Sequence, residues 1–230
     1  MDVDWKRATE GGLYTVQMAA RVLAAKPEKV RSWVEGYRHS GADAILKKDV
    51  PRVGGKTVLT FLELIETAFV RHFRAIGYSA QTIRKVAEKL RQRHCIDHPF
   101  AMEKRFKADG REIFEEVVTD KGEKRLVSLM NDSFMIVPAI EPTLFDQVFY
   151  VGDIAREFIP LVNHPRVVMN PTISFGRPAL KDLGIPTERL YDAYRAEGGE
   201  VEAADEFGIT TADILEAVRF ETELERRTLH

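Results

Sequence analysis

The 230-residue sequence contains a single cysteine, Cys95, and no long run of apolar residues. One cysteine excludes a disulfide within the chain and is typical of proteins kept in a reducing compartment. A helix needs about 20 mainly apolar residues to cross a bilayer, and no segment approaches that length. The first residues, Met-Asp-Val-Asp-Trp-Lys-Arg, lack the apolar centre of a secretion signal. We therefore expect a cytoplasmic protein without a membrane partner.

The sequence also lacks the patterns on which enzymes and metal sites depend. Carboxylates such as Asp146 and Asp153 occur without a nucleophile, a phosphate-binding loop or a metal-ligand pattern. The segment His94-Cys-Ile-Asp-His98 holds four possible ligands, but a structural metal normally needs a second ligand pair elsewhere. We interpret this segment as a helix end followed by Pro99. The sequence predicts no enzyme activity, no cofactor and no metal.

Positive and negative charges are divided between the two halves of the chain. The net charge is −2, yet residues 1–107 hold 21 Lys and Arg against 12 Asp and Glu. Residues 108–230 hold 13 against 24. Head-to-tail self-association would explain this division, but a basic and an acidic region more often bind different partners. Only the first half has the charge of a polyanion-binding region.

Residues 16–33 have the spacing of a helix-turn-helix. Small or apolar residues stand where two short crossing helices would touch: Ala19, Ala20, Leu23, Val30 and Trp33. Pro27 suits the first turn of the second helix, which is predicted to run from about Lys26 to Gly36. Such a unit usually places its second helix in the major groove of DNA. Any three-helix protein also contains a pair of helices at this angle, so the spacing leaves both interpretations open.

The residues around this motif supply candidate DNA contacts. The outward side of the second helix offers candidates for base contact: Lys26, Glu28, Lys29, Arg31 and Ser32. After Gly36, turns at Gly41, Pro51 and Gly54-Gly55 separate short β-prone pieces, which is the pattern of a wing. The wing offers candidates for phosphate contact: Arg38, Lys47, Lys48, Arg52 and Lys56. A solvated basic loop is the alternative explanation of these residues. One recognition helix reads few base pairs, so a homodimer is predicted.

Two longer helices are predicted after the wing. Apolar residues recur at helical spacing from Thr60 to Ile76, and Gly77 ends that helix. Ser79 is the predicted N-cap of the next helix, as Thr15 is for the first helix of the chain. The next helix has one apolar stripe and an opposite basic face, which contains Arg84, Lys85, Lys89, Arg91 and Arg93. It either braces the DNA-binding unit or extends its basic face, and we favour bracing.

Residues 99–163 change to a β-type pattern and are predicted to form a connector. Asp109-Gly110 lies between two β-prone runs and predicts a hairpin. Residues 119–122 suggest another turn, and residues 126–137 supply either a strand or a helix. Apolar residues in the range 144–162 are sufficient to pack the connector onto a neighbour.

Residues 164–230 are predicted to form a second helical domain. A short strand from Arg166, a turn at Asn170-Pro171 and an extended arm through Gly176-Arg-Pro178 come first. Three helices follow, at 187–197, 201–207 and from 211 to about 225. The last two helices repeat the spacing of the opening motif. The matching positions are Ala203, Ala204, Phe207, Gly208, Ile214 and Ala217, against Ala19, Ala20, Leu23, Ala24, Val30 and Trp33.

Charge opposes DNA binding by this second motif. Its helices carry acidic residues, which phosphate repels: Glu200, Glu202, Asp205, Glu206, Asp213 and Glu216. A protein partner or a dimer contact is therefore expected there.

Two parts of the chain resemble known families. The residues Tyr14-Thr-Val-Gln-Met-Ala-Ala and Val30-Arg-Ser-Trp33, with the basic wing and the two helices, make residues 12–95 similar to MerR-like DNA-binding domains. The dimerising coiled coil and the effector domain of many MerR regulators are not recognisable downstream. Residues 167–220, with Val-Val-Met-Asn-Pro, Ser-Phe-Gly-Arg-Pro and Gly-Ile-Thr-Thr-Ala-Asp-Ile-Leu-Glu-Ala-Val, resemble a helix-turn-helix family of unknown function that is common in antitoxins. The combination is similar to one class of VapB-like antitoxins.

The resemblance implies a bacterial type II antitoxin, which would neutralise a PIN-domain ribonuclease toxin and bind operator DNA to repress its own transcription. Antitoxins of this general type often inhibit with a basic side chain from a C-terminal segment, so Arg226 and Arg227 become candidate toxin contacts. Arg177 in the extended arm is another. A frayed helix end with solvated charges explains Arg226 and Arg227 equally well. The alternative function is a MerR-like regulator that senses a small molecule and has no toxin partner.

The predicted fold is mainly α with small β elements, in three parts. These are a winged helix-turn-helix at 1–98, a hairpin-containing connector at 99–163 and a three-helix helix-turn-helix domain at 164–230. A homodimer and a larger toxin–antitoxin assembly are both compatible with this organisation.

Overall fold

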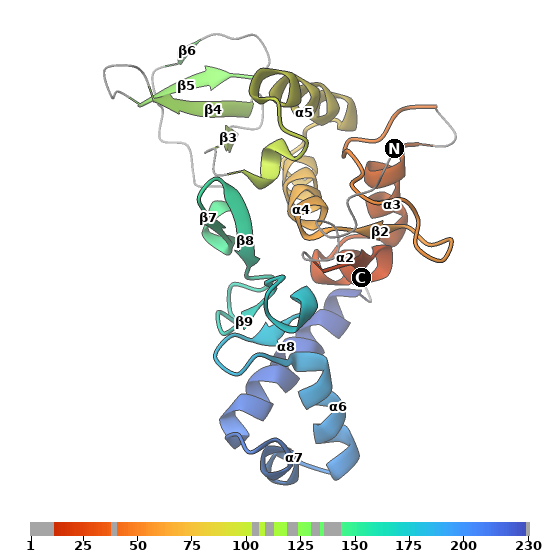
Figure 1. Cartoon of the computed structure of the whole chain (residues 1–230), viewed down its shortest axis with the longest axis vertical. Helices are drawn as coiled ribbons and strands as arrows, with labels where there is room; N and C mark the ends of the chain where they lie inside the picture. Colours follow the sequence, from red (N-terminus) through yellow and green to blue (C-terminus); the bar gives the residue numbers. More distant parts are fainter. Residues whose placement is uncertain are drawn as a thin grey trace. The chain divides into compact units, whose positions relative to one another are not determined.

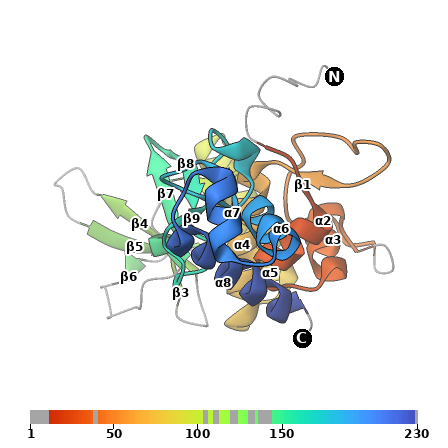
Figure 2. The ribbon, with the colours of Figure 1, turned by 90° about the horizontal axis from the view of Figure 1, so that it is seen from below.

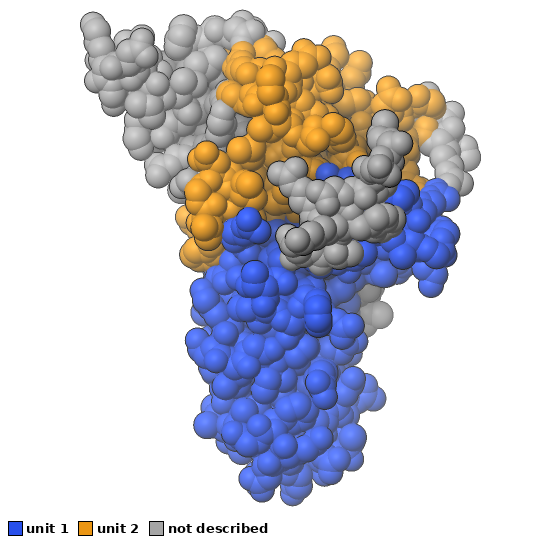
Figure 3. Space-filling view, viewed as in Figure 1, with its two compact units in different colours: residues 1–27, 49–61, 156–230 blue, residues 28–48, 62–155 orange. Residues whose placement is uncertain are grey.

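The computed structural model describes residues 12–37, 41–102, 106–108, 113–118, 124–129, 134–135 and 144–228. These residues form seven α-helices and several short strands, which confirms the predicted fold class (Figure 1). The chain divides into two compact units that alternate along the sequence. Unit 1 comprises residues 1–27, 49–61 and 156–230, and unit 2 comprises residues 28–48 and 62–155 (Figure 3). No helix in the described ranges is long and apolar enough to span a bilayer.

Unit 1 begins with β1 (Tyr14–Thr15), which pairs antiparallel with β2 (Val58–Leu59). α2 (Val16–Val22) follows at once, and the Thr15 side chain caps it by accepting a hydrogen bond of 3.1 Å from the N–H of Met18. This confirms the predicted N-cap.

A left-handed turn ends α2. The N–H of Ala24 donates to the carbonyl of Arg21, and the N–H of Ala25 donates to the carbonyl of Ala20, which is a Schellman motif. Ala24 has φ 47°, in the region that normally selects glycine. Alanine in this conformation costs roughly 1 kcal/mol, so the turn is formed against the local preference of its sequence.

The C-terminal part of unit 1 is a small sheet with three helices. β9 (Val167–Val168), β10 (Ala179–Leu180) and β11 (Ile185–Pro186) form an antiparallel sheet in the order β11-β10-β9. The predicted extended arm instead passes through a 3-10 turn, η3 (Ser174–Gly176), into β10, the central strand.

The three predicted C-terminal helices are confirmed. They are α6 (Thr187–Glu197), α7 (Glu200–Phe207) and α8 (Thr211–Thr228), of which α8 extends beyond its predicted end. α6 and α7 both contact α8, and the three helices lie side by side in Figures 1 and 2. The turn after α7 repeats the turn after α2: Gly208 N–H donates to Asp205 O, and Ile209 N–H donates to Ala204 O. The predicted repeat of the opening motif is therefore visible in the backbone.

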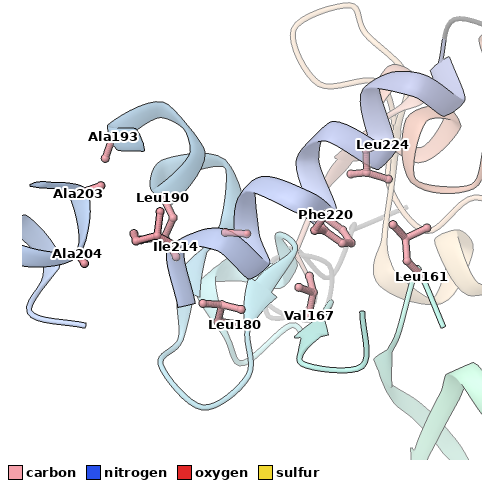
Figure 4. Close-up of a cluster of buried hydrophobic side chains, with 11 residues drawn as sticks. Leu161, Val167, Leu180, Leu190, Ala193, Ala203, Ala204, Ile214, Phe220 and Leu224 are labelled. Atoms are coloured by element: carbon pink, nitrogen blue, oxygen red, sulfur yellow. The ribbon is translucent and has the colours of Figure 1, made fainter. Parts of the chain in front are cut away.

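One apolar cluster holds the sheet and the three helices together (Figure 4). Its buried members come from the segment before β9, from the sheet and from all three helices: Leu161, Val167, Leu180, Leu190, Ala193, Ala203, Ala204, Ile214, Ala217, Phe220 and Leu224. Ile214 faces Leu190, and Phe220 lies against Val167 (Figure 4). Complete burial of one such large side chain contributes roughly 1.5–3 kcal/mol, so the cluster is the main source of stability in this part of unit 1.

Unit 2 is built on α4 (Phe61–Ala75) and α5 (Ala80–His94), with α3 (Pro27–Glu35) and the 3-10 turn η1 (Pro99–Ala101). Ser79 caps α5 by accepting a hydrogen bond of 3.0 Å from the N–H of Thr82, as predicted. The predicted apolar stripe of α5 is buried: Ile83, Val86, Ala87 and Leu90. Aromatic rings from α4, from Tyr78 and from η1 meet in its core: Phe69, Phe73, Tyr78 and Phe100.

The connector of unit 2 contains an antiparallel sheet in the order β3-β4-β5-β6. Its strands are β3 (Phe106–Ala108), β4 (Ile113–Val118), β5 (Lys124–Ser128) and β6 (Phe134–Met135). The pairing of β3 with β4 confirms the predicted hairpin, and the described residues of the range 126–137 include strand at 126–128 and 134–135 and no helix. The predicted turns at Asp109-Gly110 and 119–122 lie outside the described residues. A 3-10 turn, η2 (Leu144–Gln147), and paired strands β7 (Val148–Val151) and β8 (Ile154–Phe158) follow.

A buried carboxylate joins the two ends of unit 1. Glu221 of α8 is 3% exposed. Its Oε2 lies 2.6 Å from the guanidinium of Arg21 on α2, and its Oε1 accepts a hydrogen bond of 2.6 Å from the hydroxyl of Thr187. Burial raises the pKa of Glu221, although Thr187 and Arg21 both act to lower it.

This raised pKa predicts a pH-dependent stability. Above the ordinary glutamate pKa of 4.5, folded Glu221 retains a proton that the unfolded chain releases. The stability that this difference contributes is complete at lower pH and is lost as the pH rises through the folded-state pKa. We expect the free energy of unfolding of Glu221→Gln, relative to the natural chain, to increase across this window. Urea denaturation at a series of pH values measures it.

The matched control is Glu223, also on α8. Its pKa is lowered, first by the hydrogen bond from Asn163 and then by Arg227 and His164, against a smaller opposing effect of burial. The stability that Glu223 contributes is present above pH 4.5 and is lost as the pH falls through its folded-state pKa. The free energy of unfolding of Glu223→Gln, relative to the natural chain, must therefore change with pH in the opposite direction. Equal slopes for the two variants would contradict the assignment.

Candidate nucleic-acid interface

α3 has one buried and one exposed side. Val30, Trp33 and Val34 are buried, and each is at most 4% exposed. Four of the five candidate base contacts are exposed, on α3 or in the turn before it: Lys26, Glu28, Lys29 and Arg31. The fifth, Ser32, is half-buried, and its hydroxyl donates to the carbonyl of Lys29 at 2.7 Å. α3 therefore offers a mainly cationic solvent-facing surface, to which Ser32 contributes little.

The segment after α3 is fastened to the helix end. The N–H groups of Ile45 and Leu46 donate to the carbonyl of Trp33, at 2.8 and 3.3 Å, and both side chains are buried. Gly36 has φ 88°, and a Cβ there would lie 2.7 Å from the carbonyl oxygen of Ala42. The chain can fold back closely after α3 because this residue is glycine.

Two arginines of α5 hold the same segment. Arg84 Nε donates to the carbonyl of Asp43 at 2.9 Å, and Arg91 Nη2 donates to the carbonyl of Ile45 at 2.8 Å. These contacts confirm that α5 braces the segment that follows α3. They also engage two guanidinium groups that could otherwise have bound phosphate.

The two adjacent lysines of the predicted wing both have carboxylate partners in unit 2. Lys48 Nζ lies 2.6 Å from Glu63 Oε2, and the Glu63 side chain is fully buried. Lys47 pairs with Asp97, and both side chains are more than half exposed. Lys48 therefore supplies a cation to a buried carboxylate, whereas the pair formed by Lys47 can open to solvent at little cost.

The sequence held a signal for this arrangement. Glu63 and Glu66 lie among the mainly apolar buried residues of α4, and a buried carboxylate requires a partner. Glu66 accepts hydrogen bonds from His98 Nδ1 at 3.0 Å and from the N–H of Phe100 at 3.3 Å. His98 is thus engaged by a carboxylate. Among the described residues, no group of three possible metal ligands comes together.

The tip of the predicted wing is a hairpin turn in unit 1. Gly54 and Gly55 have φ values of 56° and 74°. They join Val53 and Lys56, whose backbone groups exchange hydrogen bonds of 2.9 and 3.0 Å. Two consecutive positive φ values are typical of a type I′ turn, which favours glycine at both positions. Arg52 and Lys56 are exposed beside this turn, while the candidate Arg38 lies outside the described residues.

In the C-terminal helix-turn-helix, the chain itself occupies the corresponding helix surface. Asp213 and Glu216 of α8 correspond to Lys29 and Ser32 in the repeat. Asp213 accepts a hydrogen bond of 2.7 Å from Arg166, and Glu216 lies 3.1 Å from His164 Nδ1. Burial acts to raise the pKa of Asp213, but hydrogen bonds from Thr210 and Arg166 together outweigh it and lower the pKa. A covered, negatively charged helix is unsuited to phosphate.

The three candidate toxin contacts have different surroundings in unit 1. Arg177 follows η3 and is exposed, and Arg226 is exposed near the end of α8. Arg227 donates to Glu223 at 2.7 Å, one helical turn away, and Glu223 also accepts a hydrogen bond from Asn163. Arg177 and Arg226 are therefore more available to a partner than Arg227.

Comparison with known proteins places these features in context. Residues 167–220, from β9 into α8, match a family described as "Protein of unknown function (DUF433)". Over 223 residues the chain is 22% identical to "Putative antitoxin VapB45" of Mycobacterium tuberculosis, covering 90% of this chain and 92% of that protein. The fold is similar to the crystal structure of Rv2018 from Mycobacterium tuberculosis. That comparison has a TM-score of 0.60 and 18% identity, and covers 89% of this chain and 96% of the other.

The adjacent lysines should differ in their effect on folding. Lys48→Ala leaves the buried carboxylate of Glu63 without this cation, so we expect a loss of about 3 kcal/mol in the free energy of unfolding. Lys47→Ala removes a solvent-screened pair and should cost about 0.5 kcal/mol or less. Chemical denaturation of the two variants measures the difference. Equal losses would show that the pairing of Lys48 with Glu63 does not support the fold.

Proposed function

We propose that this chain is the antitoxin of a bacterial type II toxin–antitoxin pair. It binds and neutralises a PIN-domain ribonuclease toxin and represses transcription from its own operator. The observation that carries this proposal is the similarity to a protein named as an antitoxin over about nine-tenths of both chains. That similarity includes both the basic N-terminal and the acidic C-terminal regions. The regions 1–98, 99–163 and 164–230 then serve as DNA-binding domain, connector and partner-binding domain.

For operator binding, α3 acts as the recognition helix. Its exposed residues include cations suited to guanine and a carboxylate that can accept from cytosine: Lys29, Arg31 and Glu28. Lys26 at its start, together with Arg52 and Lys56 at the wing turn, would contact phosphates, which fix orientation rather than sequence. Lys47 and Lys48 take a smaller part because carboxylates hold them. Arg38 is a further candidate for phosphate contact.

Two copies of the chain would bind one operator. A single short helix reads too few base pairs to select one promoter, and a two-fold symmetric dimer doubles the number read. The operator is therefore expected to be a palindrome with half-sites about one or two helical turns apart.

For toxin binding, the acidic part of the chain supplies exposed cations at separate points. PIN-domain active sites are clusters of carboxylates, so an exposed guanidinium is the complementary group. Arg177 and Arg226 fit this role, and Arg227 would first have to leave Glu223.

DNA binding is tested with single substitutions on the two surfaces. Lys29→Ala should weaken operator binding about tenfold or more and change base preference, whereas Lys56→Ala should weaken all sequences alike and reduce the salt slope by about 1. Lys85→Ala, an exposed lysine of α5, is the control and should retain affinity. Fluorescence anisotropy at several salt concentrations measures all three. Salt-insensitive or absent binding by the natural chain would contradict the assignment.

The toxin partner is tested by co-expression with the product of the adjoining reading frame. We expect the two proteins to copurify and the antitoxin to relieve growth arrest caused by the other protein. If the adjoining product neither binds nor arrests growth, while operator binding persists, the small-molecule-sensing regulator becomes the better assignment.

A further inference from the structure

The turn before β10 presents a phenylalanine to solvent on an unusual backbone. Ser174, Phe175 and Gly176 have φ values of 47°, 57° and 79°, so three consecutive residues are left-handed. Phe175 is 84% exposed, more than any other large apolar side chain in the described part of the chain. A bulky aromatic residue in this conformation is strained, and its ring gains almost no burial in return.

Contacts on both sides of the turn maintain this conformation. The hydroxyl of Tyr14, which is itself buried, donates to the carbonyl of Gly176 at 2.9 Å. The hydroxyl of Ser174 donates to the carbonyl of Gly184. The N–H of Gly176 donates to the carbonyl of Ile173 at 2.9 Å. Hydrogen bonds within the turn, from the following segment and from Tyr14, which is distant in sequence, therefore hold this conformation in unit 1.

Close packing leaves this turn little room to relax. A Cβ on Gly176 would lie 2.1 Å from the Tyr14 hydroxyl, and a Cβ on Gly12 would lie 2.4 Å from the carbonyl oxygen of Phe175. Strain of this kind persists only where the surrounding structure over-determines it, and it occurs most often at ligand-binding sites.

We propose that Phe175 is an anchor residue for the toxin, inserting its ring into an apolar pocket while Arg177 pairs with carboxylates at the pocket rim. This inference rests on the proposed antitoxin function and names the surface that performs it. Phenylalanine and arginine are both enriched in protein interfaces relative to the rest of the surface. A turn already fixed by these contacts loses little conformational freedom on binding, so little of the binding free energy is offset by the entropy cost of ordering it.

Charge favours a protein with exposed carboxylates as the occupant. Arg177 is exposed and forms no ion pair with any residue that the structure describes. A carboxylate-rich toxin site next to an apolar pocket satisfies both side chains.

The test uses the full-length chain and the purified product of the adjoining reading frame. Phe175→Gly removes the ring and also relieves the backbone strain, because glycine accepts this φ freely. We expect the dissociation constant to rise at least 50-fold and the thermal midpoint of the free chain to stay the same or increase. Asparagine also tolerates the left-handed region, so Phe175→Asn should show the same loss of affinity and the same thermal midpoint as Phe175→Gly. Arg177→Ala should weaken binding about tenfold.

Val162→Ala is the matched control, because Val162 is 72% exposed in the same unit but lies on an unstrained backbone. It should change affinity by less than twofold. Three results would overturn the proposal: unchanged toxin affinity of both Phe175 variants, a large fall in their thermal midpoint, or a fall in the oligomeric mass of the variants in solution without toxin. The last would identify the turn as a dimer contact. If the natural chain itself does not bind the product, the antitoxin function fails first, which distinguishes the two failures.

Discussion

The organisation of unit 1 depends on one contact to a buried carboxyl group between residues near opposite ends of the chain. Arg21 on α2 and Glu221 on α8 are 2.6 Å apart, and Thr187 at the start of α6 donates to the same carboxylate. Removing Arg21 or Thr187 would leave the buried carboxyl group of Glu221 with one partner fewer beside the apolar cluster of α6, α7 and α8. The first helix of the N-terminal motif therefore belongs structurally to the C-terminal helices, whatever domain boundaries function imposes.

Buried carboxylates also decide what the basic residues of unit 2 do. Glu63 is neutralised by Lys48 and Glu66 is engaged by His98, while Arg84 and Arg91 donate to backbone carbonyls. The formal positive charge of the first half thus overstates the charge that is free to meet DNA. Exposed cations remain on α3 and at the wing turn, and also on α5 at Lys85 and Arg93, so the proposed operator contacts are only a part of this charge.

The turns after α2 and α7 share backbone geometry, but the helices that follow them have different surroundings. Ala24 and Gly208 occupy the same left-handed turn position, with the same two hydrogen bonds closing each turn. The exposed side of α3 carries lysine and arginine, whereas Asp213 and Glu216 of α8 are bound by Arg166 and His164. The surface of α3 is therefore a candidate for contact with DNA, whereas residues of the chain itself occupy Asp213 and Glu216 at the matching positions of α8.

Local sequence patterns determined the helices, their caps at Thr15 and Ser79, the β3–β4 hairpin and the repeat, because each depends on residues near one another in the chain. Apolar periodicity likewise identified which side of α3 and α5 is buried. Tertiary structure alone decided that Lys48 pairs with Glu63, that Arg21 contacts Glu221, and that the Tyr14 hydroxyl donates a hydrogen bond to the turn that contains Phe175. These pairings join residues 15 to 200 positions apart, and no periodicity indicates which charge or hydroxyl a distant segment will bring to them.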